Sequence, residues 1–260
     1  MKVALVGLGA IGSVIAADIA KKGQDIYVVC KHQKTLETVK SRGIKVSGVS
    51  GDYIVKDNIK PVLTIEDLPN ELEIILLITK LPDAEEAVRR IKPKLAQEYS
   101  FLNMTNGMFE ERLTKLLEPS NVVGCVVSFA ATMVKPGESI KTSEGEIVIG
   151  RFDTPRKQID DTLISLLSST VPTKYTDNIK GYKYTKLMIN AVVASFGVIS
   201  GEKLGFMMKR KETRLAFLTV VTEGIKVGKK MGIHFQKLNG LHIPFLAIEE
   251  KCTICFRCCS

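Results

Sequence analysis

Two polar residues within an apolar helical stretch, Lys186 and Asn190, are the first candidates for chemistry in this chain. They are four residues apart, so a helix presents them on one face. Their neighbours Leu187, Met188 and Ile189 are apolar. Partial burial among such side chains lowers the pKa of a lysine towards the range in which it can act as a general acid. A lysine in this setting is a candidate general acid, but on spacing alone an ordinary pair that faces solvent is the favoured interpretation.

The N-terminal run Gly7-Leu8-Gly9-Ala10-Ile11-Gly12 has the spacing of a dinucleotide fingerprint. An apolar strand pattern precedes it at residues 2–6, and a helical apolar pattern follows. In this setting the first glycine permits a tight turn, the second lets a pyrophosphate approach, and the third brings helix and strand together. A signal peptide is the alternative for this apolar segment, but Asp18 interrupts it and Lys21-Lys22-Gly23 ends it as a helix would end.

The residue after the second predicted strand bears on the choice of nucleotide. In a Rossmann unit the end of this strand meets the adenine ribose, where an acid favours NAD and a basic residue favours NADP. Here the strand at residues 26–30 is followed by Lys31, with no acid at its end. We therefore expect NADPH, with Lys31 paired to the 2′-phosphate. An ordinary solvated loop lysine is the alternative.

Two further polar residues follow apolar runs that have the pattern of buried strands. Lys80 comes after the run at residues 74–78, and Asn106 follows the run at 100–104. Ligands of open α/β sheets bind outside the carboxyl ends of strands. We expect Lys80 to face the cofactor and Asn106 to hydrogen-bond a substrate or the nicotinamide ribose. For each, the alternative is a loop residue whose hydrogen bonds are satisfied locally.

The elements that must position these residues alternate between strand and helix up to about residue 177, which predicts a mostly parallel sheet wrapped by helices. A polar hairpin or an edge segment is expected at residues 45–58, and Thr154 is expected to cap a helix over 155–168. Other helices are expected over 83–95 and 110–117. Strands are expected at residues 2–6, 26–30, 74–78, 100–104, 122–128, 146–149 and 171–175.

Beyond residue 178 the pattern becomes helical, with two or three helices over residues 179–232 and Gly232 as a C-terminal stop. The expected fold class is therefore α/β, a Rossmann-type dinucleotide-binding domain at 1–177 followed by a smaller all-helical domain at 178–260. The first domain is expected to bind NADP and the second to supply substrate-binding and catalytic residues.

Composition excludes several classes of protein. Of 260 residues, 45% are hydrophobic and 25% charged, which is typical of a globular chain, and no apolar run has the length of a membrane span. The net charge is +9, but the basic residues are scattered, so neither nucleic acid nor a membrane is an expected partner. Cys30 and Cys125 lie in apolar runs as reduced, buried thiols, and with no secretion signal we expect a cytoplasmic protein.

The remaining four cysteines, Cys252, Cys255, Cys258 and Cys259, crowd the C-terminus. Cys-x-x-Cys-x-x-Cys can hold a metal or a cluster, but a ferredoxin-type site needs a further cysteine and a following proline. Both are missing, so we expect no metal site. A disordered tail, or one generated by truncation or frameshift, is the favoured interpretation.

Taken in order, these residues resemble the ketopantoate reductase (2-dehydropantoate 2-reductase) family over residues 1 to about 235. The resemblance implies NADPH-dependent reduction of 2-dehydropantoate to (R)-pantoate, on the route to pantothenate and coenzyme A. It implies that Lys186 donates the proton and that Asn190 and Asn106 contact the substrate. Its matching elements are the glycine fingerprint, Lys31, Thr79-Lys80, Asn106-Gly107, Ala130-Ala131, Lys135-Pro136-Gly137, the run at 147–150 and Lys186-x-x-x-Asn190.

The same resemblance implies that Lys80 and Asn106 line the cofactor and that Ala131 lies beside it. The chain departs from the family at Ala194 and at Ser200-Gly201-Glu202, where asparagines are frequent in other members. It also lacks a Ser-rich, Gln-Asp-containing stretch and a substrate-binding Glu expected beyond Gly232, for which Glu249 and Glu250 match only in residue type. Two alternatives stay open, a reductase of another small 2-oxo acid and a nucleotide-binding protein that has lost catalysis. The sequence is compatible with a homodimer.

Overall fold

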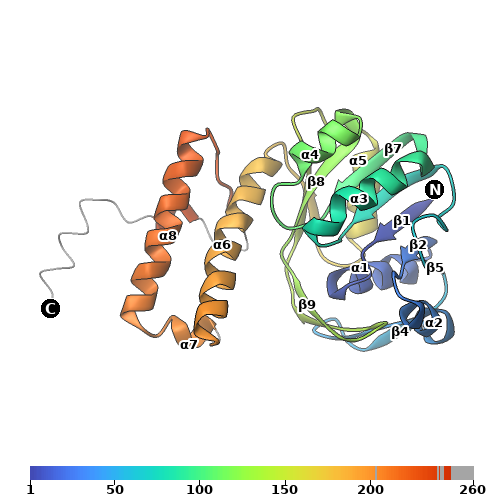
Figure 1. The fold of residues 1–260 in the computed structure, drawn as a ribbon, viewed down its shortest axis with the longest axis horizontal. Coiled ribbons are helices and arrows are strands. Elements are labelled where there is room, and N and C mark those ends of the chain that lie inside the picture. The colour runs from blue at the N-terminus through green and yellow to red at the C-terminus, as the bar shows by residue number, and fades with distance from the viewer. Residues whose placement is uncertain (203, 239, 241–242, 247–260) are drawn as a thin grey trace, which may run out of the picture. The chain divides into compact units, whose positions relative to one another are not determined.

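The computed structural model describes residues 1–202, 204–238, 240 and 243–246. Contacts divide the chain into two compact units, Met1–Ile179 and Lys180–Ser260 (Figure 1). The first unit carries the sheet and the second is helical, which confirms the expected fold class. The four C-terminal cysteines, together with Glu249 and Glu250, lie outside the described residues.

The first unit is built on an eight-stranded sheet with the strand order β12-β11-β8-β7-β6-β1-β2-β5. All neighbouring strands are parallel except β8 and β11, as a mostly parallel sheet requires. The strands are β1 (Val3–Val6), β2 (Ile26–Val29), β5 (Ile59–Val62), β6 (Leu72–Leu77), β7 (Leu95–Asn103), β8 (Val122–Val127), β11 (Ile147–Arg151) and β12 (Thr173–Tyr175).

Helices cover both faces of this sheet, because successive side chains of a strand point to opposite sides. Val3 and Leu5 pack with α1, α2 and α5, whereas Ala4 and Val6 pack with α3 and α4. Burial on both faces explains why the strands appear in the sequence as continuous apolar runs. The helices are α1 (Ala10–Lys21), α2 (Gln33–Arg42), α3 (Leu81–Ile91), α4 (Glu110–Leu116) and α5 (Ile159–Leu167), with 3-10 turns η1 (Lys92–Lys94) and η2 (Pro119–Asn121).

A smaller sheet with the order β4-β3-β10-β9 packs against α1. The antiparallel pair β3 and β4 confirms the hairpin expected at residues 45–58, and Gly48 and Gly51 adopt positive φ angles in its turn. The sequence did not predict β9 and β10, because β9 is an exposed strand at the sheet edge without apolar alternation. The strands are β3 (Ile44–Gly48), β4 (Tyr53–Val55), β9 (Ala130–Lys135) and β10 (Glu138–Ser143).

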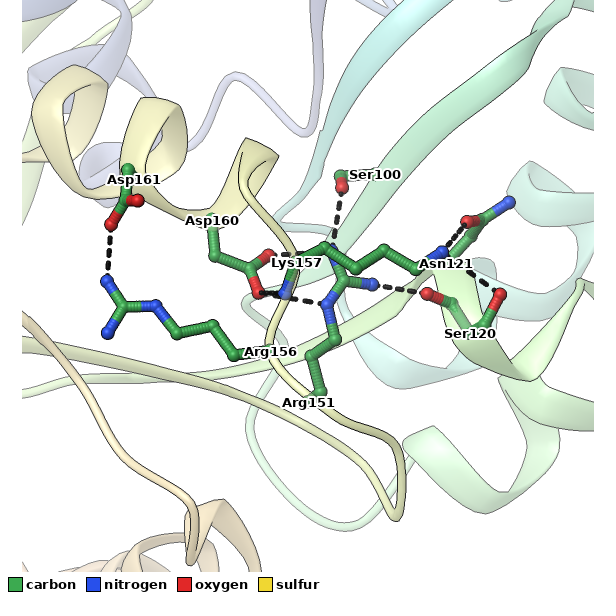
Figure 2. Close-up of polar contacts among 8 residues, drawn as sticks. All are labelled: Ser100, Ser120, Asn121, Arg151, Arg156, Lys157, Asp160 and Asp161. Carbon is green, nitrogen blue, oxygen red and sulfur yellow. Dashed lines mark hydrogen bonds and ion pairs between the residues drawn. The ribbon is translucent and has the colours of Figure 1, made fainter.

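A buried ion pair joins β11 to α5 (Figure 2). Arg151 and Asp160 are both fully buried, and two hydrogen bonds of 2.6 and 2.9 Å link the guanidinium to the carboxylate. Asp160 also accepts the backbone N–H of Lys157 at 2.8 Å, which closes a turn ahead of the helix. The helix therefore begins at Ile159, and the prediction that Thr154 caps a helix over 155–168 is wrong.

The described part of the second unit is helical, as expected over residues 179–232. Its helices α6 and α8 pack through an apolar cluster built around Val192 and Ile225. Gly232, at a φ of 72°, follows α8, and the Ile233 N–H returns to the Gly228 carbonyl at 2.9 Å, which confirms the predicted stop. In the described ranges no helix combines the length and apolarity needed to cross a membrane. The elements are α6 (Ile179–Ser200), α7 (Leu204–Met207), α8 (Lys211–Lys230) and the 3-10 turn η3 (Ile243–Leu246).

Candidate functional site

The parallel strands of the large sheet end at one common edge, and the loops beyond that edge carry most of the predicted site residues. The strand order places the ends of β8, β7, β6, β1 and β2 side by side. From β1 the chain passes to β2 on one side and later to β6 on the other, so the order reverses between β1 and β6. Open α/β sheets bind ligands at such a reversal. The glycine-rich turn, Lys80 and Asn106 lie on adjacent loops there.

The glycines of the turn between β1 and α1 serve different purposes. Gly7 has a φ of 116°, and a Cβ there would lie 2.7 Å from the backbone carbonyl of Ile78. A Cβ at Gly12 would lie 2.2 Å from the Gly7 carbonyl oxygen. Gly9 is exposed, and no heavy atom lies within 4 Å of the place its Cβ would take. Packing within the protein does not require glycine at position 9, so the open space suits another molecule.

The N-terminus of α1 supplies hydrogen-bond donors next to this open space. The first helical bond runs from the Ser13 N–H to the Gly9 carbonyl at 2.8 Å, so the N–H groups of residues 10–12 have no partner within the helix. The first turn contains no acidic side chain, and Leu8 and Ile11 are half-buried against the apolar core. Free donors and the helix dipole favour an anion here. The turn therefore fits the pyrophosphate of a dinucleotide.

Lys80 lies beyond the end of β6, as the sequence predicts, and is the exposed residue that precedes α3. The Ile78 N–H donates to the Val6 carbonyl at 2.8 Å, which holds this loop beside the glycine-rich turn. The Thr79 hydroxyl is buried and has no hydrogen-bond partner among the described residues. The loop therefore brings a positive charge and an unpaired hydroxyl to the same edge of the sheet.

The loop after β7, which carries Asn106, rests on a buried network that the sequence did not reveal. Asn103 donates from Nδ2 to Glu110 Oε1 at 2.8 Å, and its Oδ1 accepts the Thr105 hydroxyl at 2.7 Å. Asn103 and Glu110 are fully buried, whereas Asn106 is exposed. The network ties both ends of the loop together, so Asn106 is presented from a fixed support. The available signal was Asn103 itself, a polar residue inside an apolar run.

Ala131 belongs to β9, the strand that follows the end of β8. It is half-buried against the large apolar core and pairs in register with Lys141 of β10. Since β8 lies next to β7 in the large sheet, the chain enters β9 from the same carboxyl edge that carries the other loops.

Lys31 lies at the end of β2, but it does not stand alone there. Its Nζ lies 3.0 Å from the Oδ2 of Asp83, which is in the first turn of α3. The residues that follow Lys31 in the sequence contain no acid at the strand end, as expected, but the sequence did not reveal this carboxylate from α3. Fifty-two positions separate the two residues, so only the fold brings them together. Lys31 also has a φ of 62°, a conformation that is uncommon for a lysine.

The predicted proton donor, Lys186, and Asn190 both lie on α6 in the second unit. Both are half-buried, and burial lowers the pKa of the Lys186 ammonium. The residues of α6 that join the apolar cluster with α8 are Tyr184, Met188, Ile189, Val192 and Phe196. At 100° per residue, Lys186 and Asn190 lie opposite Tyr184, Met188 and Val192, and Ile189 lies between the two sides. Lys186 and Asn190 therefore share a face of α6 that borders its packing face.

Cysteine and metal chemistry finds little support in the described ranges. Cys30 and Cys125 are buried, and burial raises the pKa of the Cys30 thiol to about 11, so it stays protonated near neutral pH. Within those ranges no cluster of three or more His, Cys, Asp or Glu side chains is arranged to hold a metal ion.

Both parts of the chain match known protein families. Residues 3–154 match the family described as "Ketopantoate reductase PanE/ApbA", and residues 178–251 match "Ketopantoate reductase PanE/ApbA C terminal". The 2-dehydropantoate 2-reductase of Aquifex aeolicus is 25% identical over 237 residues, covering 88% of this chain and 73% of the relative. That of Pyrococcus horikoshii is 25% identical over 252 residues, covering 96% and 80%.

Solved structures agree at the level of the fold. A 2-dehydropantoate 2-reductase from Geobacter metallireducens superposes with a TM-score of 0.85 at 20% identity, covering 95% of this chain and 81% of that one. A D-mandelate dehydrogenase in ternary complex with NADH and anilino(oxo)acetate superposes with a TM-score of 0.84, also at 20% identity, covering 98% and 80%.

Proposed function

The chain belongs to the ketopantoate reductase family, whose members are oxidoreductases of keto and hydroxyl groups, and we propose from this that it reduces 2-dehydropantoate to (R)-pantoate with NADPH. The reaction leads towards pantothenate and coenzyme A. One observation carries the proposal: the open space at Gly9, next to the free N–H groups of α1, in a chain matched by both parts of the family.

The first unit is assigned to the dinucleotide. The backbone of residues 7–12 binds the pyrophosphate, Lys80 and Asn106 line the cofactor, and Ala131 lies beside it. Lys31 pairs with the 2′-phosphate as a point charge. When bound, NADPH supplies a hydride to the ketone carbon. The positive charges of Lys31 and Lys80 also favour the approach of an anionic cofactor and of an anionic 2-oxo acid.

The second unit is assigned to the proton. Negative charge develops on the ketone oxygen as the carbon is reduced, and an ammonium group stabilises that charge before giving up its proton. Lys186 takes this role, because burial lowers its pKa and so makes it a stronger acid than a solvated lysine. Asn190, one turn further along the same face of α6, hydrogen-bonds the substrate.

A reductase of another 2-oxo acid is the second candidate. It is favoured by the likeness of the fold to D-mandelate dehydrogenase, a protein that was solved with NADH and anilino(oxo)acetate. Both candidates use the same acid–base residue, so they differ only in the side chain of the oxo acid that is accepted.

The test is NADPH oxidation with 2-dehydropantoate, measured beside a panel of 2-oxo acids that includes phenylglyoxylate. The proposal predicts the highest kcat/KM for 2-dehydropantoate. A higher value for another 2-oxo acid selects the second candidate. If NADPH binds but no oxo acid in the panel is reduced, the chain is a nucleotide-binding member of the family without this activity.

A further inference from the structure

Asp83 and Lys31 form an ion pair at the place where a Rossmann unit binds the adenosine ribose. The Asp83 carboxylate lies 3.0 Å from the Lys31 ammonium, and their side chains are 59% and 68% exposed. Lys31 lies two residues after the second strand of the sheet, whose end meets the ribose in this fold. Asp83 lies in the first turn of α3, which follows β6, and β6 is on the other side of β1 in the strand order. The pair therefore joins the residues after β2 to the start of α3, on either side of the glycine-rich turn.

The two partners of this ion pair favour different cofactors. A carboxylate accepts a hydrogen bond from the 2′-hydroxyl of NADH and repels the 2′-phosphate of NADPH, whereas an ammonium attracts that phosphate. In most Rossmann units the acid stands at the end of the second strand. Here that place holds Lys31, and the acid arrives from α3 instead.

We propose that Asp83 sets the balance between NADPH and NADH, by holding Lys31 in an ion pair that the 2′-phosphate must displace. The inference deepens the proposed function, because it assumes that this site takes a nicotinamide dinucleotide. Exposed ion pairs are weak, so the phosphate of NADPH can still recruit Lys31. NADH, in contrast, gains an acceptor for its 2′-hydroxyl. The pair thus narrows the preference for NADPH that Lys31 would give alone.

The test compares dissociation constants for NADPH and NADH, measured from nicotinamide fluorescence at low ionic strength. Asp83→Asn removes the repulsion and releases Lys31. We expect the NADPH-to-NADH affinity ratio to rise about five- to tenfold, as two close charges in water allow, and the rise to shrink with added salt. Glu85→Gln is the matched control, because Glu85 lies on the same helix and pairs with Arg89 at 2.8 Å instead. It makes the same change in net charge and should leave the ratio unchanged.

A double variant distinguishes an effect of the Lys31–Asp83 ion pair from a long-range effect of the Asp83 charge alone. In a Lys31→Met background, Asp83→Asn should change the ratio less than it does when Lys31 is present, because no ammonium is left to release. An unchanged ratio in Asp83→Asn, or an equal rise in Glu85→Gln, would overturn the inference. Turnover of 2-dehydropantoate is scored separately, since a ratio that shifts as expected without any turnover refutes the proposed function and leaves the role of Asp83 standing.

Discussion

Gly9→Ala is the substitution that most sharply separates a ligand-binding role of the glycine-rich turn from a structural one. Gly9 has a φ of −85° and a ψ of −165°, which alanine adopts without strain, and its Cβ would meet no heavy atom within 4 Å. Where the backbone already suits it, alanine in place of glycine stabilises a protein by about 0.4–1 kcal/mol. Gly9→Ala should therefore fold at least as stably as the natural chain.

The affinity of Gly9→Ala for NADPH should decrease, although its stability does not. The added methyl group occupies the space through which a phosphate approaches the α1 N–H groups. A hydrogen bond to a charged group contributes about 1.5–3 kcal/mol, so the loss of one such bond weakens NADPH binding roughly 10- to 150-fold. Fluorescence titration with NADPH and urea unfolding of the same samples measure the two effects independently.

Two further glycines serve as controls. Gly12→Ala places its Cβ 2.2 Å from the Gly7 carbonyl oxygen and should lower the free energy of unfolding by about 1–3 kcal/mol. Gly205→Ala, on α7 with no heavy atom within 4 Å of its Cβ, should leave NADPH binding unchanged. If Gly9→Ala binds NADPH within about twofold of the natural chain, the phosphate does not approach at Gly9 and the reasoning is refuted.

Two other predictions follow from buried charges. Asp160→Ala leaves the Arg151 guanidinium buried without its carboxylate partner and should lower the free energy of unfolding in urea by about 3–5 kcal/mol. Asp161→Ala breaks only the exposed pair with Arg156 and should change that free energy by under about 1 kcal/mol. Equal losses in the two variants would contradict the account. The rate of reduction should fall as pH rises through the lowered pKa of Lys186, at a pH below the value of about 10.4 for a solvated lysine. Lys186→Arg should move that alkaline limit upward if it supports turnover, and an unchanged limit would exclude Lys186 as its source.

The sequence predicts the large sheet well, because its strands are buried on both faces and form continuous apolar runs. It also predicts the glycine-rich turn from the spacing of its glycines, although only Gly12 is required by a contact close in the chain, and Gly7 instead lies against Ile78. The exposed strand β9 escaped prediction, because backbone pairing to β10 defines it rather than a side-chain pattern. The start of α5 was misplaced for a related reason, because Asp160 is held by Arg151 from another element.

The residues of the candidate site also divide into those that the sequence predicts and those that it does not. Lys80 and Asn106 follow strands directly, so their place at the carboxyl edge could be read from the chain. Asp83 and Glu110 could not be found in this manner. Their importance depends on Lys31 and Asn103, partners that only the folded sheet brings within hydrogen-bonding distance.

The central claim, that Lys186 supplies the proton in NADPH-dependent reduction of a 2-oxo acid, is tested most directly by Lys186→Ala. Turnover of 2-dehydropantoate and the dissociation constant of NADPH are measured on the same preparation. The exposed Lys229→Ala on α8 serves as the control. The account predicts that Lys186→Ala loses turnover by about 100-fold or more, while NADPH affinity stays within about twofold and Lys229→Ala behaves like the natural chain. Retention of the natural rate by Lys186→Ala would contradict it.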